Sequence, residues 1–182
     1  MASAALKAAE EKTILNLGCG NKKFADALNL DVTARTNPDL IHNLNHYPWP
    51  VPNNFFTEVR AYDVIEHLDD ILATMEEIHR VCRHGAIVQI TVPHYSCANA
   101  FTDPTHQHYF GFSSMFYFTE GNATRFYSTA RFRIRKTTLV FQPTLMNKLI
   151  WRLANRFPEA YEQRWAWIFP AWYLHYQLEV LK

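Results

Sequence analysis

The sequence predicts an α/β fold built on a largely parallel sheet. Short apolar runs bounded by turn residues recur early in the chain, a glycine turn follows the first of them, and a strand–helix–strand unit lies in the middle. With 48% hydrophobic and 19% charged residues, the composition is typical of a globular protein. The length of 182 residues fits one domain, residues 1–182, without room for a second catalytic domain.

Four short strands are expected first, separated by Asn, Pro and Gly residues that favour turns. They lie at Thr13–Leu17, Ala27–Val32, Leu40–Leu44 and Glu58–Tyr62. Gly18 directly follows the first run, which is the form that a buried strand takes before a turn.

A helix and a strand follow. Apolar residues recur at spacings of three and four after Asp69 and Asp70, until Gly85 ends the helical pattern. Ala86–Val92 is then almost continuously apolar, which is typical of a parallel strand covered on both faces. Strand, helix and strand in this order predict a crossover unit.

The last part of the chain predicts a strand, a helix and a closing strand. Phe132–Phe141 reads as a strand, Thr144–Arg156 as an amphipathic helix, and Leu174–Val180 as a half-exposed strand in which apolar and polar residues alternate. Residues 1–12, rich in Ala, Lys and Glu, are expected to form an N-terminal helical extension.

Charge and cysteine content exclude several classes of function. A net charge of +1 provides no global field toward nucleic acid or anionic membrane, so we expect a small-molecule substrate and no nucleic acid. Cys19, Cys82 and Cys97 show no CxxC spacing, which indicates neither a disulfide framework nor a thiolate zinc site. Because no apolar leader and no run of about 18 apolar residues occurs, we expect a cytoplasmic protein.

Glycines and an acid lie where the first two strands end. Gly18 and Gly20 allow a sharp turn and the close approach of a ligand, and Asp31 can accept both hydrogen bonds from a ribose diol. Asn21 and Lys22 follow instead of a third glycine, so the pyrophosphate of NAD is poorly supported and an oxidoreductase is disfavoured. The alternative is that Gly18 and Gly20 only form a tight turn and that Asp31 caps a neighbouring element.

Six runs occur in a recognisable order over about Thr13–Phe118: LNLGCG, NLDV, PDLIHNLNHYPWP, AYDVIEHLDD, EEIHRVCRHGA and ITVPHYS. In order and spacing they resemble the class I S-adenosylmethionine-dependent methyltransferases of the methyltransferase type 11 family. The resemblance implies a Rossmann-like class I methyltransferase sheet with helices on both faces and an antiparallel C-terminal strand. It also implies S-adenosyl-L-methionine as cofactor, and methyl transfer to a hydroxyl or nitrogen of a small-molecule or glycan-like acceptor.

By the same resemblance, the glycine turn, Asn16, Gly18, Cys19 and Gly20, would hold the methionine part of the cofactor, and Asp31 would hold the ribose. The sequence departs from the family in lacking the third glycine of the first loop. Only ten residues separate Gly20 from Asp31, so the first helix must be very short.

The remaining cofactor residues follow the third and fourth strands. Asn43 stands where such enzymes usually have an Asp that faces the adenine amino group, and Leu44 would contact the ring through its backbone. Tyr62 and Asp63 would line the methionine end, and His67 would form the floor of the pocket near the methyl group.

Titratable side chains gather after the fifth strand, in residues 94–130, which we expect to form an acceptor-site insertion. Methyl transfer needs the acceptor held in line at about 3–3.5 Å, and a hydroxyl or ring nitrogen must also lose its proton. Histidine, with a pKa near ~6.5, suits that role. We expect His94 as the base, His106 or His108 as second choice, and Asp103 as the orienting group.

Alternatives remain for each assignment. The histidines and Asp103 could be structural, or could form a three-histidine or two-histidine-one-carboxylate metal set, although we expect proton transfer and no metal. The aromatic helices expected over residues 143–173 could contact a membrane surface, but burial against the sheet is the commoner outcome. A non-catalytic module that binds S-adenosylmethionine or S-adenosylhomocysteine is the alternative function.

Overall fold

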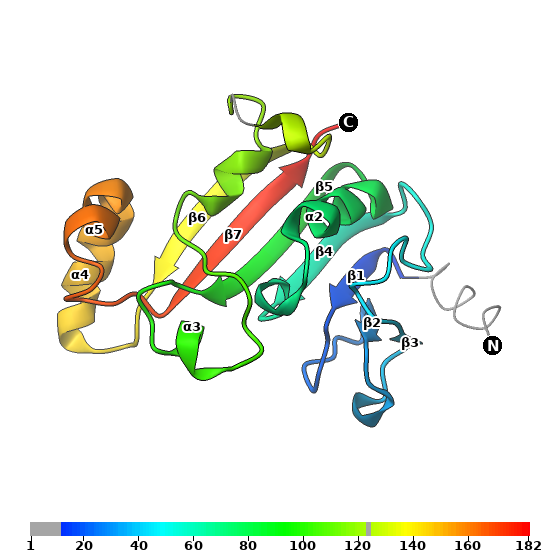
Figure 1. The fold of residues 1–182 in the computed structure, drawn as a ribbon, viewed down its shortest axis with the longest axis horizontal. Coiled ribbons are helices and arrows are strands. Elements are labelled where there is room, and N and C mark those ends of the chain that lie inside the picture. Colours follow the sequence, from blue (N-terminus) through cyan, green and yellow to red (C-terminus); the bar gives the residue numbers. More distant parts are fainter. Residues whose placement is uncertain (1–11, 123–124) are drawn as a thin grey trace.

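The computed structural model describes residues 12–122 and 125–182, without the side chain of Arg125, and contains a seven-stranded mixed sheet (Figure 1). The strand order is β3-β2-β1-β4-β5-β7-β6. The strands are β1 (Ile14–Leu17), β2 (Ala27–Asp31), β3 (Leu40–Ile41), β4 (Phe56–Tyr62), β5 (Cys82–Pro93), β6 (Phe132–Val140) and β7 (Tyr173–Val180).

Strands β1 to β5 pair in parallel, whereas β7 is antiparallel to both β5 and β6. This arrangement confirms the predicted Rossmann-like sheet with an antiparallel C-terminal strand. The third strand ends at Ile41 rather than at Leu44, because the side chain of Asn43 accepts a hydrogen bond from the backbone N–H of Asn45 at 3.0 Å and turns the chain.

The crossover helix α2 (Ile71–Val81) lies across β4 and β5 on one face of the sheet (Figure 1). It begins at Asp70, whose side chain accepts a backbone N–H of the first turn. It ends before Gly85, where the sequence predicts the end, because Cys82 is already extended and pairs with Phe56 of β4. Its fully buried apolar side chains are Met75, Ile78 and Val81.

Burial alternates along β5, so the predicted cover on both faces of Ala86–Val92 is incomplete. Val88 and Ile90 are fully buried, whereas Gln89 between them and Thr91 after them remain partly exposed. At β5 the core therefore lies chiefly on one face of the sheet, whereas β2 is buried at all five of its positions.

Residues 18–26 connect β1 to β2 by turns, without the very short helix expected there. Two buried amides hold this loop: Asn16 Nδ2 donates to the carbonyl of Lys22 at 2.9 Å and to Asn29 Oδ1 at 3.0 Å. Asn29 in turn accepts from the backbone N–H of Phe24 at 3.0 Å and donates to its carbonyl at 2.9 Å. The side chains thus satisfy backbone groups that a helix would satisfy internally.

The C-terminal helices α4 (Leu145–Arg156) and α5 (Pro158–Arg164) form a hairpin beyond β6 (Figure 1). Asn155 fixes α4 to the edge of β6, accepting from the backbone N–H of Leu139 at 2.8 Å and donating to its carbonyl at 2.9 Å. Ala154 is the buried residue of α4.

The expected burial of the C-terminal tryptophans is wrong. Trp151, Trp165 and Trp167 are 43%, 51% and 69% exposed. Helix α4 approaches the sheet through Ala154, Asn155 and the partly buried Ile150, which leaves Trp151 exposed, whereas Trp165 and Trp167 follow α5. The helical extension predicted for residues 1–12 lies outside the described residues, apart from Lys12. Within the described ranges, none of the helices has the length and apolarity needed to span a bilayer.

We predict that Asn29→Ala destabilises the protein, because it leaves buried backbone groups of the loop without partners. An unpaired buried group costs about 1–3 kcal/mol. Urea unfolding should show a lower free energy of unfolding than for Gln163→Ala, a change at an exposed position of α5. Equal stability of the two variants would mean that the amide pair does not hold the loop.

Candidate functional site

Asp31, at the carboxyl end of β2, fixes the glycine turn that follows β1. Its Oδ2 accepts a hydrogen bond from the backbone N–H of Gly20 at 2.7 Å, and its Oδ1 accepts one from Thr33 at 3.0 Å. The residue is 7% exposed. Because a carboxylate has about four acceptor positions, these two bonds leave capacity for a pair of ligand hydroxyls.

The two glycines of the turn have different reasons to be glycine, although both have positive φ, +55° for Gly18 and +47° for Gly20. A Cβ on Gly18 would lie 2.3 Å from Cγ2 of Val64, so packing inside the chain requires this glycine. A Cβ on Gly20 would meet nothing within 4 Å. The space over Gly20 is therefore open to a ligand.

Cys19 lies between these glycines and is buried. Its backbone N–H donates to the carbonyl of Leu30 at 3.0 Å, which joins the turn to β2. Burial raises the pKa of the Cys19 thiol, and the charge of Asp31 adds to the rise. Cys19 therefore contributes its backbone, not a reactive thiolate, to this edge.

The segment after β3 is fixed by α2. Leu44 is buried, and its carbonyl accepts the indole N–H of Trp49 at 3.0 Å. The backbone N–H of Trp49 donates to Glu77 of α2, and Arg80 donates to the carbonyl of Trp49 at 3.1 Å. Asn43, half-buried, thereby has a fixed position beside the end of β2.

Asp63 follows β4 with a positive φ of 57° and an exposed side chain. Its Oδ1 accepts the hydroxyl of Thr91 at 3.0 Å, which ties the ends of β4 and β5 together. Tyr62 packs edge-on against Phe24, with ring centroids 6.1 Å apart, and Lys22 lies 4.5 Å over its ring. Tyr62 therefore contacts the loop after β1, on the same edge as the glycine turn.

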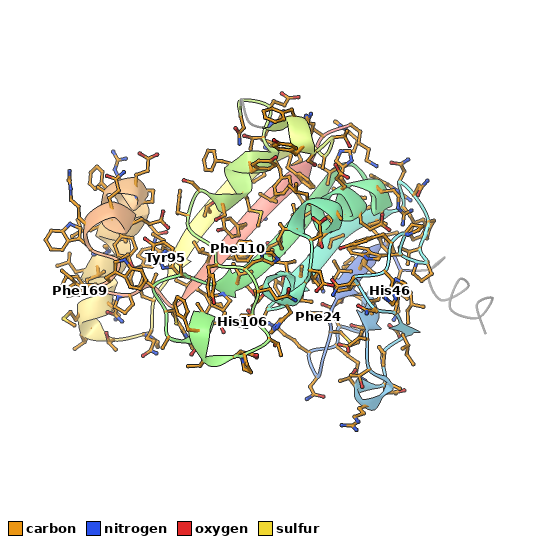
Figure 2. The ribbon with its side chains drawn as sticks, viewed as in Figure 1. Phe24, His46, Tyr95, His106, Phe110 and Phe169 are labelled. Atoms are coloured by element: carbon orange, nitrogen blue, oxygen red, sulfur yellow. The ribbon has the colours of Figure 1, made fainter. Side chains whose placement is uncertain are left out.

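His67 comes together with Asp103 and His106 beyond β4, although it lies 36 positions before Asp103 in the sequence. Asp103 accepts the hydroxyl of Thr105 at 2.6 Å, and the Thr105 oxygen lies 2.8 Å from His67 Nδ1. The His67 and His106 rings lie 4.5 Å apart by centroid. Burial lowers the pKa of the His67 imidazole. His106 lies on the side of the sheet where the parallel strands have their carboxyl ends (Figure 2).

His94 lies elsewhere, fully buried at the end of β5. Its Nδ1 accepts the backbone N–H of Ser96 at 3.1 Å, so Nε2 carries the proton and donates to Glu162 of α5 at 3.0 Å. Both ring nitrogens are thus engaged within the protein. The role of His94 as a base stays a prediction, and the geometry favours a role in joining α5 to the sheet.

Glu66 is the residue that sequence reasoning missed. It is 1% exposed, and neither carboxylate oxygen has a hydrogen-bond partner among the described residues. Burial raises its pKa to about 8, with the charges of Asp63 and Asp103 adding to the rise. The backbone N–H of His108 donates to the Glu66 carbonyl at 3.3 Å, and the buried His108 Nε2 likewise lacks a partner in the described chain. The sequence could have pointed to Glu66 only through its position beside His67 in the run AYDVIEHLDD.

No protein-family model matches the chain, and no curated protein matches it at a significant level. A SAM-dependent methyltransferase from Archaeoglobus fulgidus is 14% identical with a TM-score of 0.66, covering 98% of this chain and 92% of that one. An S-adenosylmethionine-dependent methyltransferase from Mesorhizobium loti is 15% identical with a TM-score of 0.60, covering 96% and 95%. The cyclase SpnF is 17% identical with a TM-score of 0.55, covering 99% and 81%.

These likenesses show the fold. The chain has the Rossmann-like fold that occurs in S-adenosylmethionine-dependent methyltransferases, and the cyclase shows that other proteins use it too.

We predict that His94→Ala lowers the free energy of unfolding, because it leaves a carboxylate oxygen of Glu162 without this partner. Loss of a hydrogen bond to a charged group costs about 1.5–3 kcal/mol. Urea unfolding beside His46→Ala, a change at an exposed histidine, measures the effect. Unchanged stability of His94→Ala together with lost turnover would instead support the role of a base.

Proposed function

We propose that the chain is an S-adenosylmethionine-dependent methyltransferase related to the methyltransferase type 11 family. The observation that carries the proposal is the bond between Asp31 and the backbone of Gly20. It places a carboxylate suited to a ribose diol directly beside a loop position with open space above it. The methyltransferases that share the fold support the same reading.

The residues present fit this cofactor. Asp31 retains acceptor capacity for ribose hydroxyls, and Gly20 allows close approach of the backbone. Asn43 can present its amide beside the adenine, and the exposed Asp63 can accept a hydrogen bond from the ammonium group of the methionine part. When bound, the cofactor supplies an electrophilic methyl group on a positively charged sulfur.

The chain would act mainly by holding two substrates in line. Phe101 and Tyr109 are 56% and 51% exposed and stack with ring centroids 4.8 Å apart, close in sequence to His106. Exposed aromatic rings suit the flat faces of a ring or a sugar, which supports a small-molecule or glycan-like acceptor. A proton acceptor for a hydroxyl or nitrogen would be His94, His106 or His108, with Asp103 as the orienting group. All four lie in the insertion of residues 94–130.

Turnover tests the proposal directly. The protein would be incubated with methyl-labelled S-adenosylmethionine and a low-molecular-weight cell extract, and labelled products identified by mass spectrometry. A labelled small molecule is expected. Binding of S-adenosylhomocysteine without any labelled product would favour the non-catalytic binding module, and tight binding of NAD would overturn the cofactor assignment.

We predict that Asp31→Ala weakens the binding of S-adenosylhomocysteine at least about tenfold, because each hydrogen bond to a charged acceptor contributes about 1.5–3 kcal/mol. Calorimetric titration measures the change. Asp26→Ala is the matched control, since Asp26 is an exposed carboxylate just before the amino end of β2. Equal affinity of the folded Asp31→Ala variant and the control would contradict the assigned site.

A further inference from the structure

Three groups that donate lone pairs converge beyond the carboxyl end of β4. Glu66, His67 and His106 each offer one ligand atom, and these atoms lie within 4.8 Å of one another. Glu66 and His67 belong to a 3-10 turn over Ile65–His67, and His106 comes from the insertion after β5. The three-dimensional fold, not the sequence alone, brings them together.

The proton of His67 can be located from its neighbours. The hydroxyl of Thr105 donates to Asp103 at 2.6 Å, so its hydrogen is not available to the imidazole. The contact of 2.8 Å between Thr105 Oγ1 and His67 Nδ1 therefore uses the proton of His67 Nδ1. His67 Nε2 is left with an unshared lone pair.

The same reasoning applies to His106. Its Nδ1 lies 3.1 Å from the backbone carbonyl of Ala100, which can only accept. Nδ1 therefore carries the proton, and Nε2 again has a free lone pair. Both imidazoles are thus held in the tautomer that a metal ion binds through Nε2.

Glu66 completes the set. An ionised carboxylate only accepts, and none of the described residues donates to either oxygen of this buried side chain. Burial without a partner disfavours the charged form of this side chain. A cation bound by all three residues would compensate that charge.

We propose that Glu66, His67 and His106 bind one divalent transition-metal ion, with Zn²⁺ as the best match. Two imidazoles and a carboxylate, with a position left for water or substrate, form a ligand set typical of catalytic zinc, and imidazoles disfavour Mg²⁺ and Ca²⁺. Asp103, through Thr105, and the Ala100 carbonyl supply the outer hydrogen bonds that orient metal-binding histidines.

This set differs from the one considered from the sequence, because His94 is engaged by Glu162 and Ser96. His67 and His106 are half-buried, so a metal ion in solution can reach both rings. The inference does not rest on methyl transfer, since metal binding can be measured without turnover.

The test is a titration of the chelator-treated full chain with Co²⁺, followed by visible absorption, with Zn²⁺ added as competitor. One equivalent of Co²⁺ should bind and be displaced by Zn²⁺. His67→Ala and His106→Ala should abolish stoichiometric binding, and Thr105→Val should weaken it about 10–100-fold, as loss of an outer partner does. His46→Ala, at an exposed histidine outside the cluster, should bind normally.

Absence of stoichiometric binding by the folded wild-type chain would overturn the proposal. So would binding that survives in both His67→Ala and His106→Ala. Glu66→Gln is a further variant, and circular dichroism checks whether it folds. If it does not fold, the His67→Ala and His106→Ala variants still decide whether the cluster binds the metal ion.

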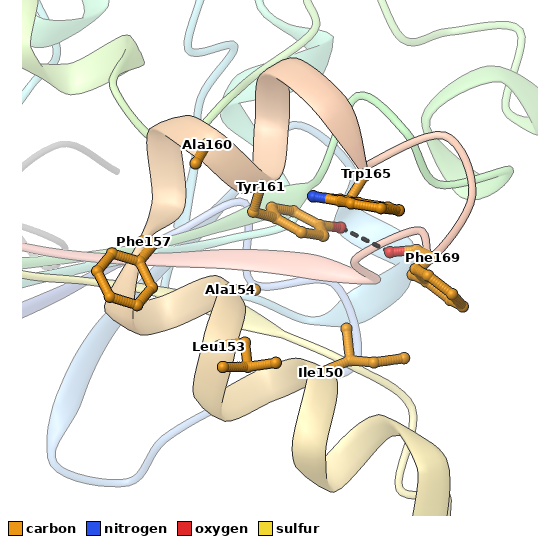
Figure 3. Close-up of a pocket in the computed structure, with 8 residues that line it drawn as sticks. All are labelled: Ile150, Leu153, Ala154, Phe157, Ala160, Tyr161, Trp165 and Phe169. Carbon is orange, nitrogen blue, oxygen red and sulfur yellow. Dashed lines mark hydrogen bonds between the residues drawn. The ribbon is translucent and has the colours of Figure 1, made fainter.

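A separate surface lies on the α4–α5 hairpin. A groove of about 360 Å³ between the two helices is lined by apolar side chains, among them Leu153, Phe157 and Trp165 (Figure 3). The hydroxyl of Tyr161 donates to the carbonyl of Phe169 at 2.8 Å and fixes the far wall of this groove.

Helix α4 exposes two adjacent ridges, one apolar and one basic. Leu145, Leu149 and Leu153 recur every four residues and are 86%, 64% and 54% exposed. Lys148, Arg152 and Arg156 recur with the same spacing, are exposed, and have no acidic residue beside them on α4. Ile168, after α5, is exposed and lines a further pocket together with Met146 of α4, so it extends this apolar surface.

We infer that this hairpin surface binds an anionic lipid bilayer. Leucines and tryptophans beside a row of cations form the pattern of a helix that lies in the membrane interface, where long cationic side chains reach the headgroups. The basic ridge argues for an anionic surface rather than for a neutral one.

Sedimentation with vesicles of phosphatidylcholine, with and without phosphatidylserine, tests this inference. Binding is expected only with phosphatidylserine, and should be lost in Arg152→Glu and Leu149→Ser but kept in Arg83→Glu, an exposed site on β5. Failure to sediment with phosphatidylserine would overturn it. So would a stable dimer that Leu149→Ser dissociates, because a second copy of the chain would then occupy the surface.

Discussion

Two buried amides, Asn16 and Asn29, hold the loop on which the candidate cofactor edge depends. They face each other in register on β1 and β2, bond to each other, and satisfy the backbone of residues 18–26 in place of a helix. Asn29 also donates to Asp39 at 2.9 Å, which ties the same loop to the segment before β3. The glycine turn and the acid at the end of β2 therefore keep their positions although the connection between the strands is unusually short.

The same turn also positions the cluster around Glu66. Because Gly18 has no Cβ, Val64 can pack directly against the loop after β1, and Val64 immediately precedes the turn that carries Glu66 and His67. Groups suited to a ribose and groups suited to a metal ion thus share one edge of the sheet through a single close contact. Parallel strands favour such sites, because their carboxyl ends meet at one edge.

The succession of strands along the chain could be predicted, because apolar runs and turn residues are local signals. The position of Gly18 and Asp31 at the ends of their strands could be predicted for the same reason. The partners of His94 and Glu66 could not. His94 bonds to Glu162, 68 positions later, and an apolar strand that ends in histidine looks the same whether that ring faces a ligand or a carboxylate. The exposure of Trp151 on α4 was equally hidden, since composition does not say which face of a helix meets the sheet.

Asp31 and the Gly20 turn together form the proposed site of S-adenosylmethionine. A crystal structure of the chain with S-adenosylhomocysteine tests this site most directly. We expect that the ribose hydroxyls donate to the carboxylate of Asp31 and that the ligand passes over Gly20. A ligand bound at another edge of the sheet, or a ribose with no contact to Asp31, would contradict it.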